Sequence, residues 1–213
     1  MTNSKKYSSG EILANFLSVI FHPLFIPFYT VTLYFFISPN FFLPSNIKFL
    51  ETYLIIVSII IPLLFLLTFL YSGFIQSTSL KTTKERFYFS FVMFTVYFIL
   101  SQKIASFHIF LELLPFFIGI TFSIFMVGLL NFFHKKPSLH AMALGGSLAF
   151  LMIWSFYSHL DILWFLILVI FISALVLSAR VYIEEHSLRE IAWGFFIGIL
   201  MQILAFWISY FFF

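Results

Sequence analysis

Long, uninterrupted apolar runs constrain this chain more than any other feature of its sequence. Charged residues make up 9% of the 213 residues, whereas hydrophobic residues make up 62% and aromatic residues 23%. An ordinary soluble domain has about a quarter of its residues charged. A fold of this size in water could not hide 35 phenylalanines in its core. Lipid is therefore the expected solvent for much of the chain, and nucleic acid is not an expected partner.

The apolar runs have the length of transmembrane helices. A helix that crosses a hydrocarbon core of about 30 Å needs roughly 20 apolar residues. Runs of this kind, separated by charge, proline or asparagine, predict seven segments. They are approximately Ile12–Ile37, Thr52–Ile75, Phe87–Ser101, Phe107–Phe133, Leu139–Ser158, Ile162–Leu177 and Ile191–Phe213. The connections are too short to fold alone. We therefore expect residues 1–213 to form one integral-membrane domain, an all-α bundle of six or seven transmembrane helices.

The first predicted segment allows two topologies. It contains His22, Pro23 and Pro27 in the sequence FHPLFIP, and proline in a helix interior kinks or breaks it. The segment is therefore either a kinked span or a re-entrant hairpin. The two alternatives place the amino terminus on opposite faces of the membrane, and the sequence leaves both open.

The basic residues gather on one side of this predicted topology. Counting loops along seven spans places nine of the 11 lysines and arginines on one face. They are Lys5, Lys6, Lys81, Lys84, Arg86, Lys135, Lys136, Arg180 and Arg189. The positive-inside rule alone would make this face cytoplasmic. Seven of the nine, however, fall in three clusters that also carry histidine, serine or acidic residues: SLKTTKERF, HKKPSLHA and SARVYIEEHSLRE.

These clusters are expected at the same membrane face, because two spans separate each from the next. They can therefore converge on one site. Lysine and arginine held at the level of the lipid headgroups suit an anionic group, and the bidentate geometry of arginine suits phosphate in particular.

The third cluster combines a histidine with a carboxylate at helical spacing. Glu190 follows His186 by four residues, so on a helix its carboxylate can accept a hydrogen bond from one imidazole nitrogen. The other nitrogen is then available as a base or nucleophile of fixed tautomer. Arg180, at the end of the preceding span, can hold the anion that this nitrogen attacks. The alternative is a solvated loop without chemistry.

The second cluster begins a helix. Pro137 is a start signal, and Ser138 with the backbone amides that follow offers hydrogen-bond donors to an anion. His140 lies one turn inside and can give a proton to a leaving oxygen. Two pairs of glycines are expected to allow close helix packing. They are Gly145 with Gly146, and Gly194 with Gly198.

The first cluster supplies Lys81, Lys84 and Arg86 just before a span. By itself it would be read as juxtamembrane charge.

The order and content of the three clusters resemble the type 2 phosphatidic acid phosphatase superfamily, the membrane branch of the vanadium-haloperoxidase fold. That family carries the motifs K-x6-R-P, P-S-G-H and S-R-x5-H-x3-D in this order. The resemblance covers roughly residues 80–198. The third motif is matched by Arg180, His186 and Glu190, the second by Pro137, Ser138 and His140, and the first by Arg86.

This chain departs from the family pattern at several positions. Glu190 replaces the aspartate, Leu139 replaces the glycine of P-S-G-H, and Phe87 replaces the proline after the first-motif arginine. The role of the family's lysine falls on Lys84 or Lys81, because Ser79 stands seven residues before Arg86. The resemblance is thus to a divergent member.

The resemblance implies a metal-independent phosphatase of lipid phosphates or isoprenoid diphosphates. His186 would form a phosphohistidine, oriented by Glu190, and His140 would protonate the leaving group. The phosphoryl oxygens would be held by Arg86, Arg180, Ser138, and Lys84 or Lys81. No cofactor or metal is expected, since lysine and arginine supply the positive charge. The expected partners are a lipid phosphate substrate and membrane lipids, in the cell membrane of a bacterium.

Other functions compete with this interpretation. A small transporter or structural bundle would use the basic clusters only for orientation and would leave His140, Arg180 and His186 dispersed. A non-catalytic lipid-binding protein would share the anion-binding residues without needing the histidine pair. The lipid, the choice between hydrolysis and phosphotransfer, the membrane face of the site and the oligomeric state are all left open by the sequence.

Overall fold

The structure, a computed structural model, describes residues 8–38, 42–76, 80 and 82–212. This part of the chain is helical and contains no strand. Its α-helices are α1 (Ser9–Ile20), α2 (Ile26–Ile37), α3 (Pro44–Ile55), α4 (Ile61–Tyr71), α5 (Thr83–Ser106), α6 (Leu114–Phe132), α7 (Leu139–Ser158), α8 (Leu163–Tyr182) and α9 (Leu188–Phe212). A π-helical turn, Ile56–Ile60, joins α3 to α4, and a 3-10 helix, His108–Leu113, precedes α6.

Six helical segments in the described residues are long and apolar enough to cross a membrane. They are Pro44–Tyr71, Thr83–Ser106, His108–Phe132, Leu139–Ser158, Leu163–Tyr182 and Leu188–Phe211. The expected all-α bundle is thus present in the described residues, and six of its segments have the length and apolarity that a transmembrane helix needs. Many large apolar side chains, such as Phe171 and Trp207, are exposed on its outer surface, as suits helices surrounded by lipid.

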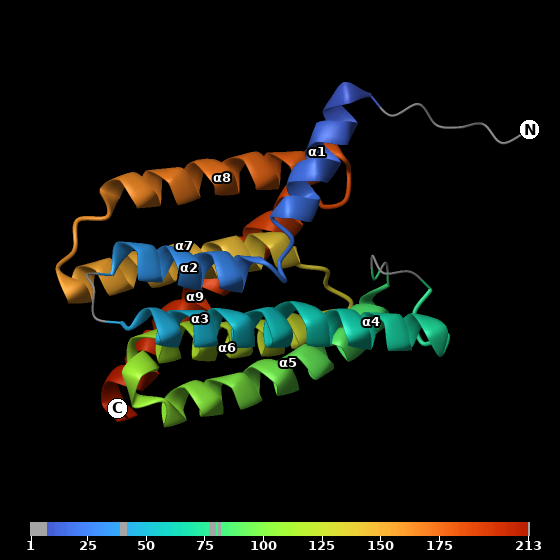
Figure 1. The fold of residues 1–213 in the computed structure, drawn as a ribbon. Coiled ribbons are helices and arrows are strands. Elements are labelled where there is room, and N and C mark those ends of the chain that lie inside the picture. The colour runs from blue at the N-terminus through green and yellow to red at the C-terminus, as the bar shows by residue number, and fades with distance from the viewer. Residues whose placement is uncertain (1–7, 39–41, 77–79, 81, 213) are drawn as a thin grey trace, which may run out of the picture.

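The first predicted segment, residues 12–37, is two shorter helices and not one span. The chain leaves helical geometry between Ile20 and Ile26, where Pro23 cannot continue the hydrogen-bond ladder and Pro27 lies in the first turn of α2. In Figure 1, α2 runs along the bundle, whereas α1 lies across one end of it, next to the carboxyl-terminal part of α8.

Helix α5 begins at Thr83, within charged sequence and four residues before the predicted apolar segment, which starts at Phe87. A capping box starts this helix: the Thr82 hydroxyl accepts from the Glu85 amide, and the Glu85 carboxylate accepts from the Thr82 amide. A search for uncharged runs cannot find such a start. The cap places Arg86 inside the first turn of the helix.

Glycines hold α7 and α9 in close contact. A Cβ atom on Gly194 would clash with the Ser138 carbonyl oxygen, and one on Gly198 would clash with the Met142 carbonyl oxygen. Glycine at these positions therefore lets the two backbones touch. The Ser138 amide also donates to the Glu190 carbonyl at 3.0 Å. The start of α7 is thus fixed beside the start of α9.

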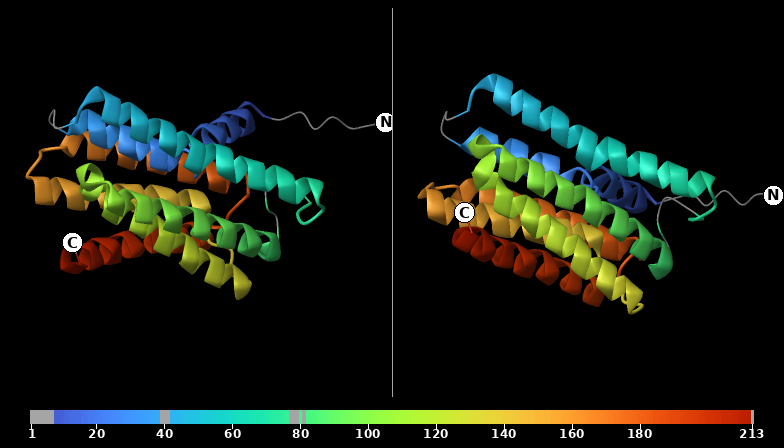
Figure 2. Two further views of the ribbon diagram at one scale, coloured as in Figure 1. Left: turned by 60° about the horizontal axis from the view of Figure 1, so that its bottom comes forward. Right: turned by 90° about the horizontal axis from the view of Figure 1, so that it is seen from below.

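The described residues of the three charged clusters lie at the same end of the bundle. The amino-terminal ends of α5, α7 and α9 and the carboxyl-terminal ends of α4, α6 and α8 are together there, and α1 lies at that end too (Figures 1 and 2). This is the arrangement that the alternation of spans predicts for the three clusters.

Candidate functional site

A cavity of about 410 Å³ opens between the helices at this end of the bundle. Its walls include Arg86 from α5, His140 from α7, Arg180 from α8, and His186 from the connection between α8 and α9. These four residues were singled out in three sequence clusters separated by spans, and they share one space. If the basic clusters served only to orient the bundle in a membrane, these four side chains would not need to share one cavity.

His186 is held in a defined orientation by Glu190. Its Nδ1 lies 3.0 Å from Glu190 Oε2, the contact that the spacing of four residues predicts. The same carboxylate oxygen accepts from the Ser187 amide at 3.0 Å, and the Glu190 amide donates to the Ser187 hydroxyl at 3.3 Å. Glu190 therefore caps α9 and fixes the histidine at once. Since Nδ1 is engaged, Nε2 is the nitrogen left for chemistry.

The imidazole of His186 is almost completely buried, with 2% of its side chain exposed. Burial, followed by the charges of Arg86 and Arg180, lowers the pKa of His186 from 6.5 to about 4, against the opposing effect of the Glu190 hydrogen bond. The ring is therefore neutral at pH 7, and Nε2 carries a lone pair.

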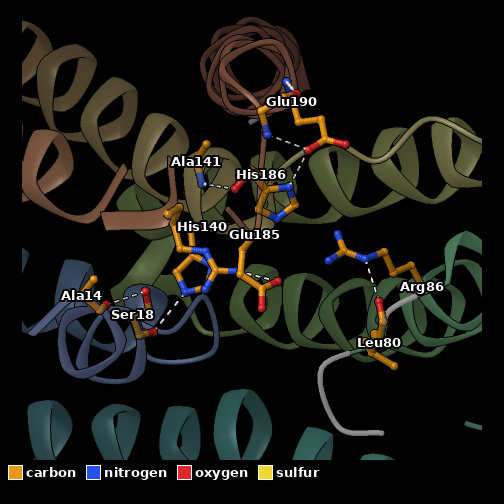
Figure 3. A network of polar contacts seen from close by, with 12 residues as sticks. Ala14, Ser18, Leu80, Arg86, His140, Ala141, Glu185, His186 and Glu190 are labelled. Atoms are coloured by element: carbon orange, nitrogen blue, oxygen red, sulfur yellow. Dashed lines mark hydrogen bonds and ion pairs between the residues drawn. The ribbon is translucent and has the colours of Figure 1, made fainter. Parts of the chain in front are cut away.

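The terminal nitrogens of the Arg86 guanidinium are directed into the cavity. Its Nε donates to the Leu80 carbonyl at 2.9 Å, which fixes the side chain and leaves the two terminal nitrogens without a hydrogen-bond partner among the described residues. Figure 3 shows the guanidinium directed toward His186 and Glu185. Two parallel donors of this kind match two oxygens of a phosphate.

Arg180 has an incomplete set of partners. Its Nη2 lies 3.6 Å from Glu185 Oε2, a long ion pair, and its buried Nε has no hydrogen-bond partner in the described part of the chain. A buried donor without an acceptor costs free energy. An anion in the cavity would satisfy it, and the Glu185 carboxylate already shows that Arg180 holds acid oxygens at this position.

His140 faces α1 as well as the cavity. Its Nε2 lies 3.1 Å from the Ser18 carbonyl oxygen and, since a carbonyl only accepts, must carry the proton. The His22 ring packs edge-on against the His140 ring, with centroids 5.6 Å apart. His22 also lines the cavity, and burial and the charge of Arg180 lower its pKa to about 4.

Sequence reasoning did not assign His22 or α1 to the site. His22 was considered only as part of a break in the first segment. The sequence feature that could have pointed to His22 is this same break, in which a histidine stands beside two prolines inside an apolar segment. Nothing in the sequence, however, indicates that α1 lies across the end of α8.

Two other residues predicted to bind phosphate, Ser138 and Lys84, do not line the cavity. Ser138 is fully buried as the amino-terminal cap of α7, where its hydroxyl accepts from the Ala141 amide at 3.5 Å. Lys84 is exposed on the first turn of α5. Lys81 lies outside the described residues. The described residues also hold no group of three or more histidine, aspartate or glutamate side chains placed to bind a metal ion.

The remainder of the cavity is mostly apolar and extends into the bundle. Its deeper walls include Phe89, Met93, Phe116 and Ile124. Along α5 the lining runs from Arg86 to Tyr97, which at 1.5 Å per residue corresponds to about 17 Å. The cavity thus joins a cationic mouth to an apolar interior, the arrangement that suits an amphiphile with an anionic head.

Comparisons with protein-family models, curated proteins and solved structures find no match for this chain. Its function is therefore inferred from the geometry of the site.

Proposed function

We propose that this protein is a metal-independent phosphatase of membrane lipid phosphates, of the type 2 phosphatidic acid phosphatase kind, that works through a phosphohistidine. One observation supports this above the others. A buried histidine with its Nδ1 on a carboxylate shares a cavity with two arginines whose donors are not all used. This combination provides an oriented nucleophile and an oxyanion site together.

In the first step, Nε2 of His186 attacks phosphorus. The P–N bond forms as the P–O bond to the lipid breaks. Glu190 accepts the hydrogen bond from Nδ1 throughout and so stabilises the positive charge that develops on the ring. Arg86 and Arg180 bind the non-bridging oxygens and offset their charge in the transition state.

The departing lipid oxygen needs a proton, and His140 is the candidate donor. Its Nε2 proton is engaged by the Ser18 carbonyl, so the proton transferred comes from Nδ1 of the imidazolium form. Because burial and the charge of Arg180 oppose this charged form more than the Ser18 carbonyl favours it, the bound anionic phosphate must supply the rest of its stabilisation. His140 then takes a proton from a water molecule, which attacks phosphorus and breaks the P–N bond, and inorganic phosphate leaves.

Ser138 and the lysines hold different places in this proposal. The Ser138 hydroxyl acts indirectly, since it caps α7 and thereby positions His140. Lys84 is exposed on the first turn of α5, two residues before Arg86, and does not line the cavity; its proposed role is to attract the anionic head by its charge.

The test is phosphate release from a panel of lipid phosphates by detergent-purified protein in the presence of a metal chelator. We expect turnover that falls roughly a thousandfold or more in His186→Ala, as for the loss of other catalytic nucleophiles. His108→Ala is the matched control, because His108 is exposed at the opposite end of the bundle. Phosphate label trapped on the wild-type protein should be stable in base and lost in acid.

Turnover that survives in His186→Ala would exclude the proposed nucleophile. Binding of the lipids without release of phosphate by the wild type would instead favour a non-catalytic lipid-binding protein.

A further inference from the structure

The proposed mechanism leaves one histidine of the cavity unused. His22 lies in the connection between α1 and α2 and lines the cavity together with His140. Its ring packs edge-on against the rings of His140 and Phe25, with centroids 5.6 and 6.3 Å away. Aromatic packing on two neighbours limits the rotation of the His22 ring, so each of its two nitrogens has defined surroundings.

A backbone amide fixes the tautomer of His22. Its Nδ1 accepts a hydrogen bond from the Leu24 amide at 3.3 Å. A nitrogen that accepts presents its lone pair, so the proton of the neutral ring is on Nε2. The Leu24 amide is the only hydrogen-bond partner of this ring among the described residues. The Nε2–H group is therefore a donor without an acceptor in that part of the chain.

The other two histidines of the cavity have their N–H groups in use. The Nε2–H group of His140 donates to the Ser18 carbonyl. The Nδ1–H group of His186 donates to the Glu190 carboxylate. Within the described walls of the cavity, His22 is thus the histidine whose N–H group is left for a ligand. A buried donor of this kind is expected to meet an acceptor when the ligand is bound.

His22 is suited to hydrogen bonding and unsuited to proton transfer. Burial and, to a smaller extent, the charge of Arg180 lower its pKa to about 4, so the ring is neutral at pH 7. A proton added at Nδ1 would also remove the acceptor of the Leu24 amide. The ring therefore offers an N–H donor that keeps its proton, unlike the imidazolium that the mechanism requires of His140.

The charges around His22 indicate an anionic oxygen as the missing acceptor. Arg86 and Arg180 line the same cavity and have nitrogen donors that are not all used. The charge of Arg180 acts on His22, so an anion that binds this arginine also comes close to the imidazole. A phosphate monoester has three non-bridging oxygens, and α5, α8 and the α1–α2 connection each supply a donor to this space.

We propose that the Nε2–H group of His22 donates a hydrogen bond to a non-bridging oxygen of the phosphoryl group that Arg86 and Arg180 hold. This inference rests on the proposed function and adds a ligand-binding residue that lies outside the three sequence clusters. Because the donor is fixed before the ligand arrives, it can stabilise the charge on the phosphoryl oxygens without reorganisation. No proton is transferred in this contact.

The test removes the donor and retains the ring. His22→Phe keeps an aromatic side chain against His140 but loses the N–H group. Binding to the full-length, detergent-purified protein is measured by calorimetry for two probes: inorganic phosphate, and a phosphonate analogue of a phosphatidate that cannot be hydrolysed. We expect both probes to bind about tenfold more weakly to the variant. With a hydrolysable lipid phosphate, kcat should fall about a hundredfold.

His22→Gln is the rescue variant. The side-chain amide of glutamine places an N–H donor at about the reach of the histidine Nε2, so this variant should recover most of the lost affinity. His108→Phe is the matched control, because His108 is exposed at the opposite end of the bundle and does not line the cavity (Figure 1). It should bind both probes like the wild type.

A spectroscopic measurement tests the contact in the wild type itself and does not depend on the folding of a variant. In protein that carries isotope-labelled histidine, His22 should show the Nε2–H tautomer, and phosphate should shift the resonance of that proton. The resonance is assigned by its absence from the spectrum of His22→Gln.

Unchanged binding of either probe in His22→Phe would overturn this inference even if phosphate is released. Equal losses in His22→Phe and His22→Gln would overturn it too, because the ring and not the donor would then matter, and so would an Nε2 proton that phosphate does not shift. Binding that depends on the His22 donor, without release of phosphate from any lipid, would support the inference and contradict the proposed phosphatase.

The two probes also distinguish the source of the phosphoryl group. Tighter binding of the phosphonate lipid than of inorganic phosphate by the wild type would indicate a lipid headgroup. Equal binding would indicate free phosphate, still held by His22 if affinity depends on the donor. A wild-type protein that binds neither probe would contradict this inference and the proposed function together.

Discussion

At the scale of single residues, the His186 environment predicts an unusual titration. Burial and two arginines favour the neutral ring and lower its pKa to about 4, although the Glu190 hydrogen bond favours the charged one. The nucleophile should therefore remain unprotonated well below pH 6.5 and become protonated only as the pH falls through about 4. In histidine-labelled, ligand-free protein, one imidazole that titrates near pH 4 should disappear from the NMR spectrum of His186→Ala.

Replacing Glu190 with glutamine provides the internal check. Glutamine removes the charge that favours imidazolium, so the pKa of His186 should fall further. Turnover should fall as well, because a neutral amide no longer stabilises the positive charge that develops on the ring during the attack. The lowered pKa of His186 also makes the stability of the folded protein depend on pH. The unfolded state, with a pKa near 6.5, takes up the proton first, so this residue's contribution to stability is lost as the pH falls from about 6.5 to about 4. A His186 resonance titrating near 6.5 would contradict this account.

The distance between two groups along the chain determined whether the sequence could predict their contact. The contact of His186 with Glu190 spans four residues on one helix, and helix geometry alone gives it. The contact of His140 with the Ser18 carbonyl joins residues 122 positions apart. This contact depends on how α1 packs against the bundle, which no local sequence pattern encodes. The position of His22 in the cavity wall depends on the same packing. Ser138 was predicted as a phosphate ligand, yet its hydroxyl is engaged as a helix cap.

At the scale of helices, the α7–α9 contact should be essential for the site. Gly194→Ala would place a Cβ atom against the Ser138 carbonyl oxygen, so the helices must separate or shift. We expect a loss of about 1–3 kcal/mol in stability from overpacking. Turnover should fall by more than the loss of folded protein explains, because His140 moves relative to His186. Thermal unfolding and phosphate release, measured on the same preparations, would show this.

Gly10→Ala is the matched control for that substitution. The atoms nearest to a Cβ added at Gly10 belong to the Tyr182 side chain, which is exposed and can move. Stability and turnover should both be close to wild type. A Gly194→Ala protein with unchanged turnover would show that the α7–α9 contact does not position the site.

For the whole molecule, the apolar composition was sufficient to predict a bundle of long helices, but it was not sufficient to predict the structure of the first segment. The apolar runs predicted the six long segments, because only helices satisfy their backbone within lipid over such lengths. The same criterion placed α1 and α2 in one apolar segment, and its prolines left open whether that segment is a kinked span or a re-entrant hairpin. Boundaries such as Thr83 were missed where a capping box begins a helix within charged sequence.

The membrane orientation of the whole bundle is the remaining prediction. Arg86 and Arg180 line the cavity and are explained by chemistry, so they are poor indicators of topology. Lys84 is set aside with them, because it is proposed to attract the anionic head. Among the other basic residues that the structure describes, Lys135, Lys136 and Arg189 lie at the end with the cavity, and Lys48 and Lys103 lie at the opposite end. Since α1 also lies at the cavity end, it gives no separate signal for the opposite orientation. The positive-inside rule then places the cavity at the cytoplasmic face.

The absence of cysteine from the chain makes this orientation directly measurable. A single cysteine is introduced either at the exposed His134, at the cavity end, or at the exposed Gln102, at the opposite end. Intact cells are then treated with a membrane-impermeant thiol reagent. Cysteine at 102 should be labelled in intact cells, whereas cysteine at 134 should react only after the cells are opened. The reverse pattern would place the cavity outside, and its lysines would then owe their position to binding an anionic headgroup and not to topology.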